Sequence, residues 1–66
     1  MAVAKVIEIS AQSNTSLEDA IQEGVRRASD TVENIQGAWI KEQQVDVENG
    51  KIVAYRVNMK VTFLLN

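Results

Sequence analysis

The chain has 66 residues without cysteine, histidine or proline, and its seven basic and nine acidic residues give a net charge of −2. Residues 1–66 are long enough for a single domain only, and a chain of this size buries just about 60% of its extended surface. Because disulfides and histidine metal ligands are excluded, we expect self-association to supply the missing stability. The scattered basic residues argue against nucleic acid as a partner.

The hydropathy pattern argues against a membrane location. No apolar run approaches the roughly 20 residues that a membrane-spanning helix needs. The N-terminus lacks the basic and then apolar pattern of a signal peptide, so a cytoplasmic protein is expected.

The first two predicted elements are a strand and a helix. Val3–Ser10 is rich in β-branched residues and predicts a strand. From Ser16 to Gly37, apolar residues recur every three or four positions, which predicts an amphipathic helix of about 19 residues. Gly24 in its interior indicates close approach by a neighbouring element. The apolar stripe consists of Leu17, Ala20, Ile21, Gly24, Val25, Ala28, Val32 and Ile35.

Both ends of the predicted helix carry signals. Ser16 is suited to cap its start, and Asp19 lies at the reciprocal position of a capping box. Gly37 suits the left-handed conformation just past a helix end. Glu23 and Arg27 have the four-residue spacing of an ion pair on a solvated face.

Two further strands are joined at Asn49-Gly50, a dipeptide suited to the two positive φ angles of a type I′ turn. An antiparallel sheet then requires the last, most apolar strand in the middle. The predicted fold class is α+β: a β-α-β-β subunit with a three-stranded antiparallel sheet, in the order 1-3-2, packed on one helix. On the last strand, the face toward the helix is Val53, Tyr55, Val57, Met59, Val61, Phe63 and Leu65, and the other face is Ala54, Arg56, Asn58, Lys60 and Thr62.

The predicted hairpin is longer than the helix that covers it. A helix of about 19 residues spans about 28 Å, whereas the strand from Lys51 to Leu65 spans about 50 Å. The hairpin should overhang by roughly 20 Å, and an uncovered apolar patch marks an interface. The apolar residues of this tip are Val45, Val47, Ile52 and Val53.

Trp39, the only tryptophan, is predicted to lie on the side of the sheet away from the helix. With a two-residue turn, Trp39 faces Lys60 and Gln43 faces Arg56, and facing residues share one side. The group on this side is then Trp39, Lys41, Gln43, Arg56, Asn58 and Lys60.

A bulge would reverse this assignment. Glu42, Gln44 and Asp46 on the opposite side indicate an irregular hairpin, unless they lie in the overhang, where water or oligomer contacts satisfy them. The pattern leaves two roles open for Trp39: packing in a subunit interface, or stacking on a flat ligand.

Catalytic machinery is not evident in this composition. Hydroxyls and carboxylates without an activating partner do not indicate an enzyme. Glu18 and Asp19 at the helix start are explained by the helix dipole. Asp46 and Glu48 are weak candidates for a hard-cation site between subunits, and a solvated turn is the alternative.

Four features together resemble the dodecins, small flavin-binding proteins of bacteria and archaea. They are the strand KVIEI, the helix with AI and then RA, a tryptophan soon after the helix, and the closing strand YRVNMKVTF. The resemblance covers nearly the whole chain and implies a hollow homododecamer. It also implies non-enzymatic binding of riboflavin, FMN or FAD for storage and photoprotection. In the family, the tryptophan at the position of Trp39 stacks on the flavin ring.

The same resemblance implies roles for the other candidate residues. Arg56 follows the last-strand tyrosine, where many flavin-binding members have glutamine. Arginine offers only donors, so it can meet flavin carbonyls or a phosphate, the latter favouring FMN, FAD or coenzyme A. The expected flavin site is Trp39, Arg56, Gln43, Asn58 and Lys60. The alternative is a flavin-free dodecin-like shell that is structural or binds calcium or another small ligand.

Overall fold

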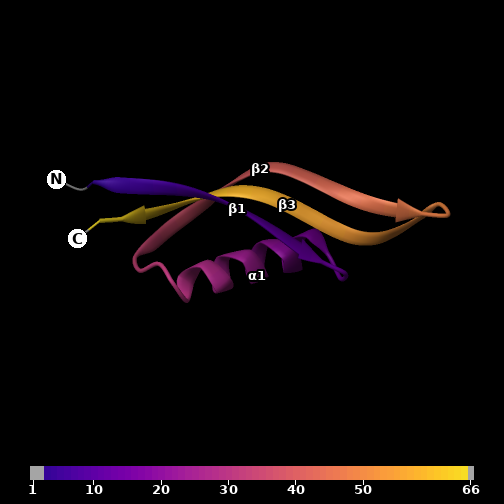
Figure 1. The fold of residues 1–66 in the computed structure, drawn as a ribbon, viewed down its shortest axis with the longest axis horizontal. Helices are drawn as coiled ribbons and strands as arrows, with labels where there is room; N and C mark the ends of the chain where they lie inside the picture. Colours follow the sequence, from indigo (N-terminus) through magenta and orange to yellow (C-terminus); the bar gives the residue numbers. More distant parts are fainter. Residues whose placement is uncertain (1–2, 66) are drawn as a thin grey trace.

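The computed structural model describes residues 3–65 as a three-stranded antiparallel sheet with one helix against one face (Figure 1). The sheet order β1-β3-β2 confirms the predicted topology. The molecule is elongated, with extents of 52 × 19 × 13 Å. No helix within the described residues is long and apolar enough to cross a membrane. The elements are β1 (Ala4–Ser13), α1 (Leu17–Ser29), β2 (Ile35–Glu48) and β3 (Lys51–Leu64).

The start of α1 is capped as predicted, with one change of partner. The Ser16 Oγ accepts a hydrogen bond from the Asp19 backbone N–H at 2.9 Å. The Asp19 carboxylate does not complete a capping box but accepts a hydrogen bond from the Ser13 hydroxyl at 2.6 Å. The Ser13 Oγ in turn accepts from the backbone N–H of Thr15 at 2.9 Å. The predicted turn therefore starts later, because β1 continues to Ser13 and joins this network.

The end of α1 differs from the prediction. The helix stops at Ser29, and the left-handed residue that follows it is Asn34, with φ 64°, rather than Gly37. Asparagine tolerates this conformation because its short polar side chain can hydrogen-bond locally. Gly37 lies within β2 instead. The apolar periodicity continued to Ile35 because the first residue of β2 packs against the same core.

The predicted ion pair on α1 forms with a different arginine. Glu23 accepts a hydrogen bond from the Arg26 Nε at 3.2 Å, so the spacing is three residues rather than the four that separate it from Arg27. Both side chains are exposed to solvent. The hydrogen bond from Arg26 lowers the pKa of the Glu23 carboxyl below its usual value.

The core lies between α1 and the middle of the sheet. Met59 and Val61 on β3 are fully buried. Gly24 permits this packing, because an added Cβ would lie 2.5 Å from the Met59 Cε and 3.0 Å from the Ala11 Cβ. The expected close approach at Gly24 is thus confirmed. The core cluster is Ala20, Val57, Met59 and Val61, with Ile7, Ile9, Ala11, Leu17, Ile21, Val25, Ile35 and Ile40 packed around it.

Beyond the helix, the β2–β3 hairpin continues uncovered to its tip (Figure 1). Asn49 and Gly50 have φ angles of 52° and 77°, which confirms the predicted turn. The apolar side chains of the tip are exposed as expected: Val45 38%, Val47 58%, Ile52 52% and Val53 41%. The monomer leaves these groups in water, since no element of residues 3–65 packs over them.

Candidate functional site

The candidate site lies on the outer face of the sheet, defined here as the face away from α1. On β3, Lys60, Asn58 and Arg56 alternate with residues of the core, so their side chains belong to this face. The pairing of β1 with β3 is regular, and it places Glu8 opposite Lys60 and Ser10 opposite Asn58. The outer face is therefore a polar surface spanning all three strands.

Trp39 lies at one end of this surface. It pairs with Lys60, as predicted, and its side chain is 75% exposed. The indole is thus not a filler of this chain's own core. Lys41 donates to the Glu8 carboxylate at 3.3 Å. A shallow cavity of about 190 Å³ is lined by Trp39, Ile40, Lys41 and Lys60.

A bulge in β2 follows directly after this tryptophan. Ile40 pairs with Met59, and the next pair is Glu42 with Asn58, which leaves Lys41 as the extra residue. A bulge shifts every later side chain of the strand to the opposite face. Glu42 therefore enters the outer face, where its carboxylate accepts a hydrogen bond from the Asn58 amide at 3.4 Å.

The predicted pairing of Gln43 with Arg56 is wrong for this reason. Gln44 faces Arg56, and Gln43 instead faces the buried Val57. The polar residues at alternate positions 42, 44 and 46 were the sequence signal for this bulge. A further irregularity, on the other strand, leaves Val53 unpaired between Ala54 and Ile52, so the uninterrupted alternation of β3 begins after Val53.

Next to the bulge is a polar cavity of about 340 Å³. It brings together three predicted site residues, Arg56, Asn58 and Gln43. The Arg56 guanidinium donates to the Asp46 carboxylate at 3.0 Å. Trp39 and Lys60 lie apart from this cavity: Lys60 is about 7 Å from Asn58 and about 13 Å from Arg56 along β3. The full lining is Ser10, Glu42, Gln43, Gln44, Arg56, Val57 and Asn58.

Sequence reasoning missed two of the acceptor residues of this cavity, Glu42 and Gln44. Arg56 offers donors only, whereas the carboxylate of Glu42 and the amide oxygen of Gln44 accept hydrogen bonds. The outer face thus combines an exposed aromatic plane with donors and acceptors along one line. Such a surface can hold a flat, polar-edged molecule, provided that a second surface covers the indole.

The two weak candidates for a cation site have little support from geometry. Asp46 is engaged with Arg56 in an ion pair. Within residues 3–65, no three acidic side chains gather in a way that could hold a metal ion.

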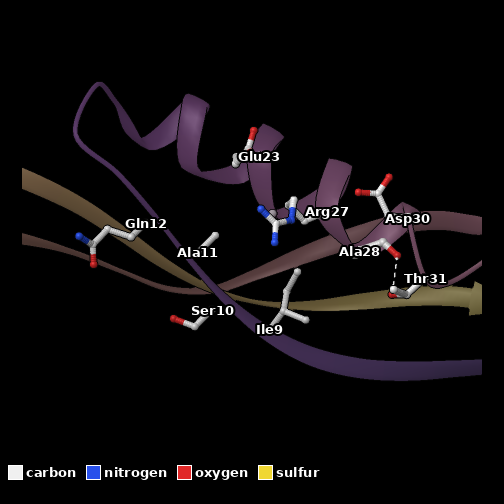
Figure 2. Close-up of a pocket in the computed structure, with 10 residues that line it drawn as sticks. Ile9, Ser10, Ala11, Gln12, Glu23, Arg27, Ala28, Asp30 and Thr31 are labelled. Atoms are coloured by element: carbon white, nitrogen blue, oxygen red, sulfur yellow. Dashed lines mark hydrogen bonds between the residues drawn. The ribbon is translucent and has the colours of Figure 1, made fainter.

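A larger cavity, of about 570 Å³, lies between α1 and β1 (Figure 2). Ile9, Ala11 and Gly24 line it, and the Arg27 side chain lies between the helix and the strand, whereas Glu23 points away from the sheet. It contains no aromatic side chain. We therefore place the candidate site for a planar ligand on the outer face of the sheet.

The fold defines a class of small β-α-β-β subunits in which an antiparallel sheet packs against a single helix. A sequence model of the Dodecin family matches residues 3–66. The chain belongs to the dodecin family.

Named relatives bear out this assignment. The calcium dodecin of Mycobacterium tuberculosis is 41% identical over 63 residues, covering 96% of this chain and 89% of that protein. The crystal structure of that calcium-chelating antigen, with a novel calcium-binding site, matches with a TM-score of 0.82 at 43% identity, over 97% of this chain and 91% of the other.

Solved dodecins from other organisms are similar in fold. The dodecin from Streptomyces davaonensis gives a TM-score of 0.92 at 31% identity, over 98% of this chain and 96% of the other. A tryptophan-to-phenylalanine variant of the Thermus thermophilus dodecin gives 0.93 at 29% identity, over 100% of this chain and 98% of the other.

Proposed function

We propose that this protein is a non-enzymatic flavin-binding protein that stacks riboflavin, FMN or FAD on Trp39 in the cytoplasm. The observation that carries the proposal is the indole itself, 75% exposed on the outer face of the sheet. A flat ring laid on this indole would gain about 0.5–1.5 kcal/mol beyond the effect of buried area. The polar groups from Lys60 to Arg56 would then meet the polar edge of the ligand.

The role that follows is storage with photoprotection. An indole in stacking contact can transfer an electron to a photoexcited flavin, which quenches the excited state before it reacts elsewhere. This mechanism needs no nucleophile, base or metal ion. It agrees with the resemblance to flavin-binding dodecins described above.

The binding site would be completed by other copies of the chain, in a hollow homododecamer. A single copy offers one face to the ligand, whereas a stacked ligand must be covered on both sides to leave water. The exposed apolar tip at Val47 and Ile52 gives an independent reason to assemble, because such patches are interfaces in soluble proteins.

Riboflavin titration, followed by flavin fluorescence, tests the proposal. We expect the wild-type protein to quench the fluorescence and to be yellow as purified. Trp39→Ala should weaken binding by about tenfold or more, since loss of stacking and burial exceeds about 1.4 kcal/mol. Trp39→Phe keeps an aromatic plane, so its affinity for riboflavin should lie between those of the wild type and Trp39→Ala.

Two controls make this test decisive. The mass of each variant in solution should equal that of the wild type, because an indole on the outer face does not support the core. An unquenched titration by wild-type protein of correct mass would refute flavin binding.

A second candidate function is calcium binding in a flavin-free shell. The relative at 41% identity is named a calcium dodecin, which is the observation in its favour. Colourless protein, no quenching of riboflavin, and a higher Tm on addition of calcium would support it. Asp46→Asn with Glu48→Gln should then abolish the calcium-dependent rise in Tm, and an unchanged rise would exclude these two residues.

A further inference from the structure

We propose that Asp46 sets the ligand specificity of the polar cavity, so that the site accepts an uncharged flavin of the riboflavin type and disfavours flavins that carry phosphate. The inference rests on the proposed function. It concerns which member of the flavin class binds, and it assigns to Asp46 a selective role through Arg56.

The first step is the geometry of the ion pair. Arg56 faces Gln44 across the hairpin, and Asp46 lies two pairs further along, opposite Ala54. The two charged side chains are thus diagonal neighbours on one face, with Nη2 and Oδ2 3.0 Å apart. The guanidinium that would otherwise attract a phosphate is already turned toward a carboxylate.

The second step is the charge around the cavity. Arg56 is the only cationic residue in its lining, and Glu42 is a second carboxylate there beside the Asp46 partner of Arg56. The net charge of Arg56, Glu42 and Asp46 together is −1. A phosphate monoester is bound well where several donors or cations converge on it. Here it would approach two carboxylates, and it would also have to displace one of them from the arginine.

The third step is what the cavity offers to a neutral ligand. Asn58, Gln44 and Ser10 contribute uncharged polar groups to the outer face or its cavity. Together with the carboxylate of Glu42 they supply both donors and acceptors for carbonyls, a ring N–H and hydroxyl groups. An uncharged flavin can use these groups without any charge being neutralised.

Lys60 gives an alternative place for an anion on this face. It lies opposite Trp39, and it forms no ion pair with any residue from 3 to 65. It is about 13 Å from Arg56 along β3, so a phosphate held there would lie far from Asp46. A phosphate bound near Arg56 would respond to substitution of Asp46, and a phosphate bound near Lys60 would respond to substitution of Lys60. Variants at these two residues therefore distinguish the two positions.

The experiment compares dissociation constants for riboflavin and FMN, measured by fluorescence quenching on the assembled protein. We expect wild-type protein to bind riboflavin more tightly than FMN. Asp46→Asn, which keeps the shape and removes the charge, should tighten FMN about fivefold while riboflavin changes less than about twofold. Coenzyme A, another phosphate-bearing probe, should also bind more tightly to Asp46→Asn than to the wild type. The FMN gain should shrink at high salt.

Glu48→Gln is the matched control, because it removes one carboxylate from the same strand outside the cavity. It should leave the ratio of the two constants unchanged. Tighter binding of FMN by the wild type, or an unchanged ratio in Asp46→Asn, would overturn the inference. So would loss of FMN affinity in Lys60→Gln with no effect of Asp46→Asn.

These results are distinguishable from failure of the proposed function. If both flavins bind through Trp39 but the ratio of their dissociation constants is the same in the wild type and in Asp46→Asn, only the specificity inference fails. If neither flavin is quenched, the flavin function and this inference fail together.

Discussion

The two ends of the sheet have similar composition and opposite environments. At the covered end, Val57, Met59 and Val61 lie beneath α1 and are almost fully buried. At the hairpin tip, Val47 and Ile52 are more than half exposed. The reason is length: a helix of 13 residues reaches about 20 Å, whereas a strand of 14 residues reaches about 46 Å.

This comparison teaches that one strand can serve two different partners. The covered half of β3 is stabilised within the chain, and its outer face carries Lys60 opposite Trp39. The half toward the tip has no helix beneath it and must find its partner elsewhere. The polar cavity lies along the sheet between Trp39 and the tip, so a ligand there would lie close to the proposed subunit interface.

The largest expected effect comes from breaking the uncovered end. Val47→Asp should prevent assembly, because burying an unpaired carboxylate in an apolar contact costs several kcal/mol. The mass in solution, measured by light scattering, should fall below that of the wild type. Val47→Thr, which keeps a β-branched side chain without charge, should retain the assembly. A full-sized particle formed by the Val47→Asp variant would show that the tip is not an interface.

An intermediate effect is expected from overfilling the covered end. Gly24→Ala gains about 1 kcal/mol in helix propensity but loses about 1–3 kcal/mol to crowding. The Met59 Cε can move, yet the Ala11 Cβ, 3.0 Å from the new methyl group, is fixed to its strand. We therefore expect a net loss of about 1 kcal/mol in the free energy of unfolding by denaturant.

The source of this crowding can be separated with Met59→Leu, which removes the terminal methyl at similar volume. Gly24→Ala should cost about 0.5 kcal/mol less in the Met59→Leu background if the Met59 side chain is an obstacle. An unchanged cost would assign the crowding to Ala11, and a stabilising Gly24→Ala would contradict the packing altogether.

The smallest effect is expected on the solvent side of α1. The ion pair with Arg26 lowers the pKa of Glu23, so its contribution to stability is present above the usual carboxyl pKa and is lost as pH falls through the lowered value. Glu23→Gln should thus lower Tm slightly at pH 7 and not at all in strong acid. Glu33→Gln is the control, and an equal, pH-independent shift in both would contradict the assignment.

Much of the fold follows from the sequence because its signals are local. The tight turn at Asn49-Gly50 and the cap at Ser16 each depend on residues only a few positions apart. The sheet order follows from strand direction and from the apolar character of β3. The predicted end of α1 was wrong because Ile35 continues the helical period of apolar residues from another element. The chain turns at Asn34, and Ile35 packs against the same core as the first residue of β2.

The candidate site was predictable only up to the first bulge in β2 after Trp39. Trp39 opposite Lys60 depends on counting pairs from the turn, and here two bulges, one on each strand, compensate between the turn and this pair. Gln43 lies between these two bulges, so counting places it one residue out of register. The pairing of Arg56 with Asp46 depends on the same shift and could not be derived by counting.

The bulge at Lys41 has a consequence for how this family of sites can diversify. The pairs on either side of Lys41 are Ile40 with Met59 and Glu42 with Asn58, so loss of that single residue would join two adjacent pairs into a regular ladder. Glu42, Gln44 and Asp46 would keep their side of the sheet, and only the local bend and twist that a bulge adds would be lost. A one-codon deletion at this position would thus leave both the polar lining and the stacking platform on the same face.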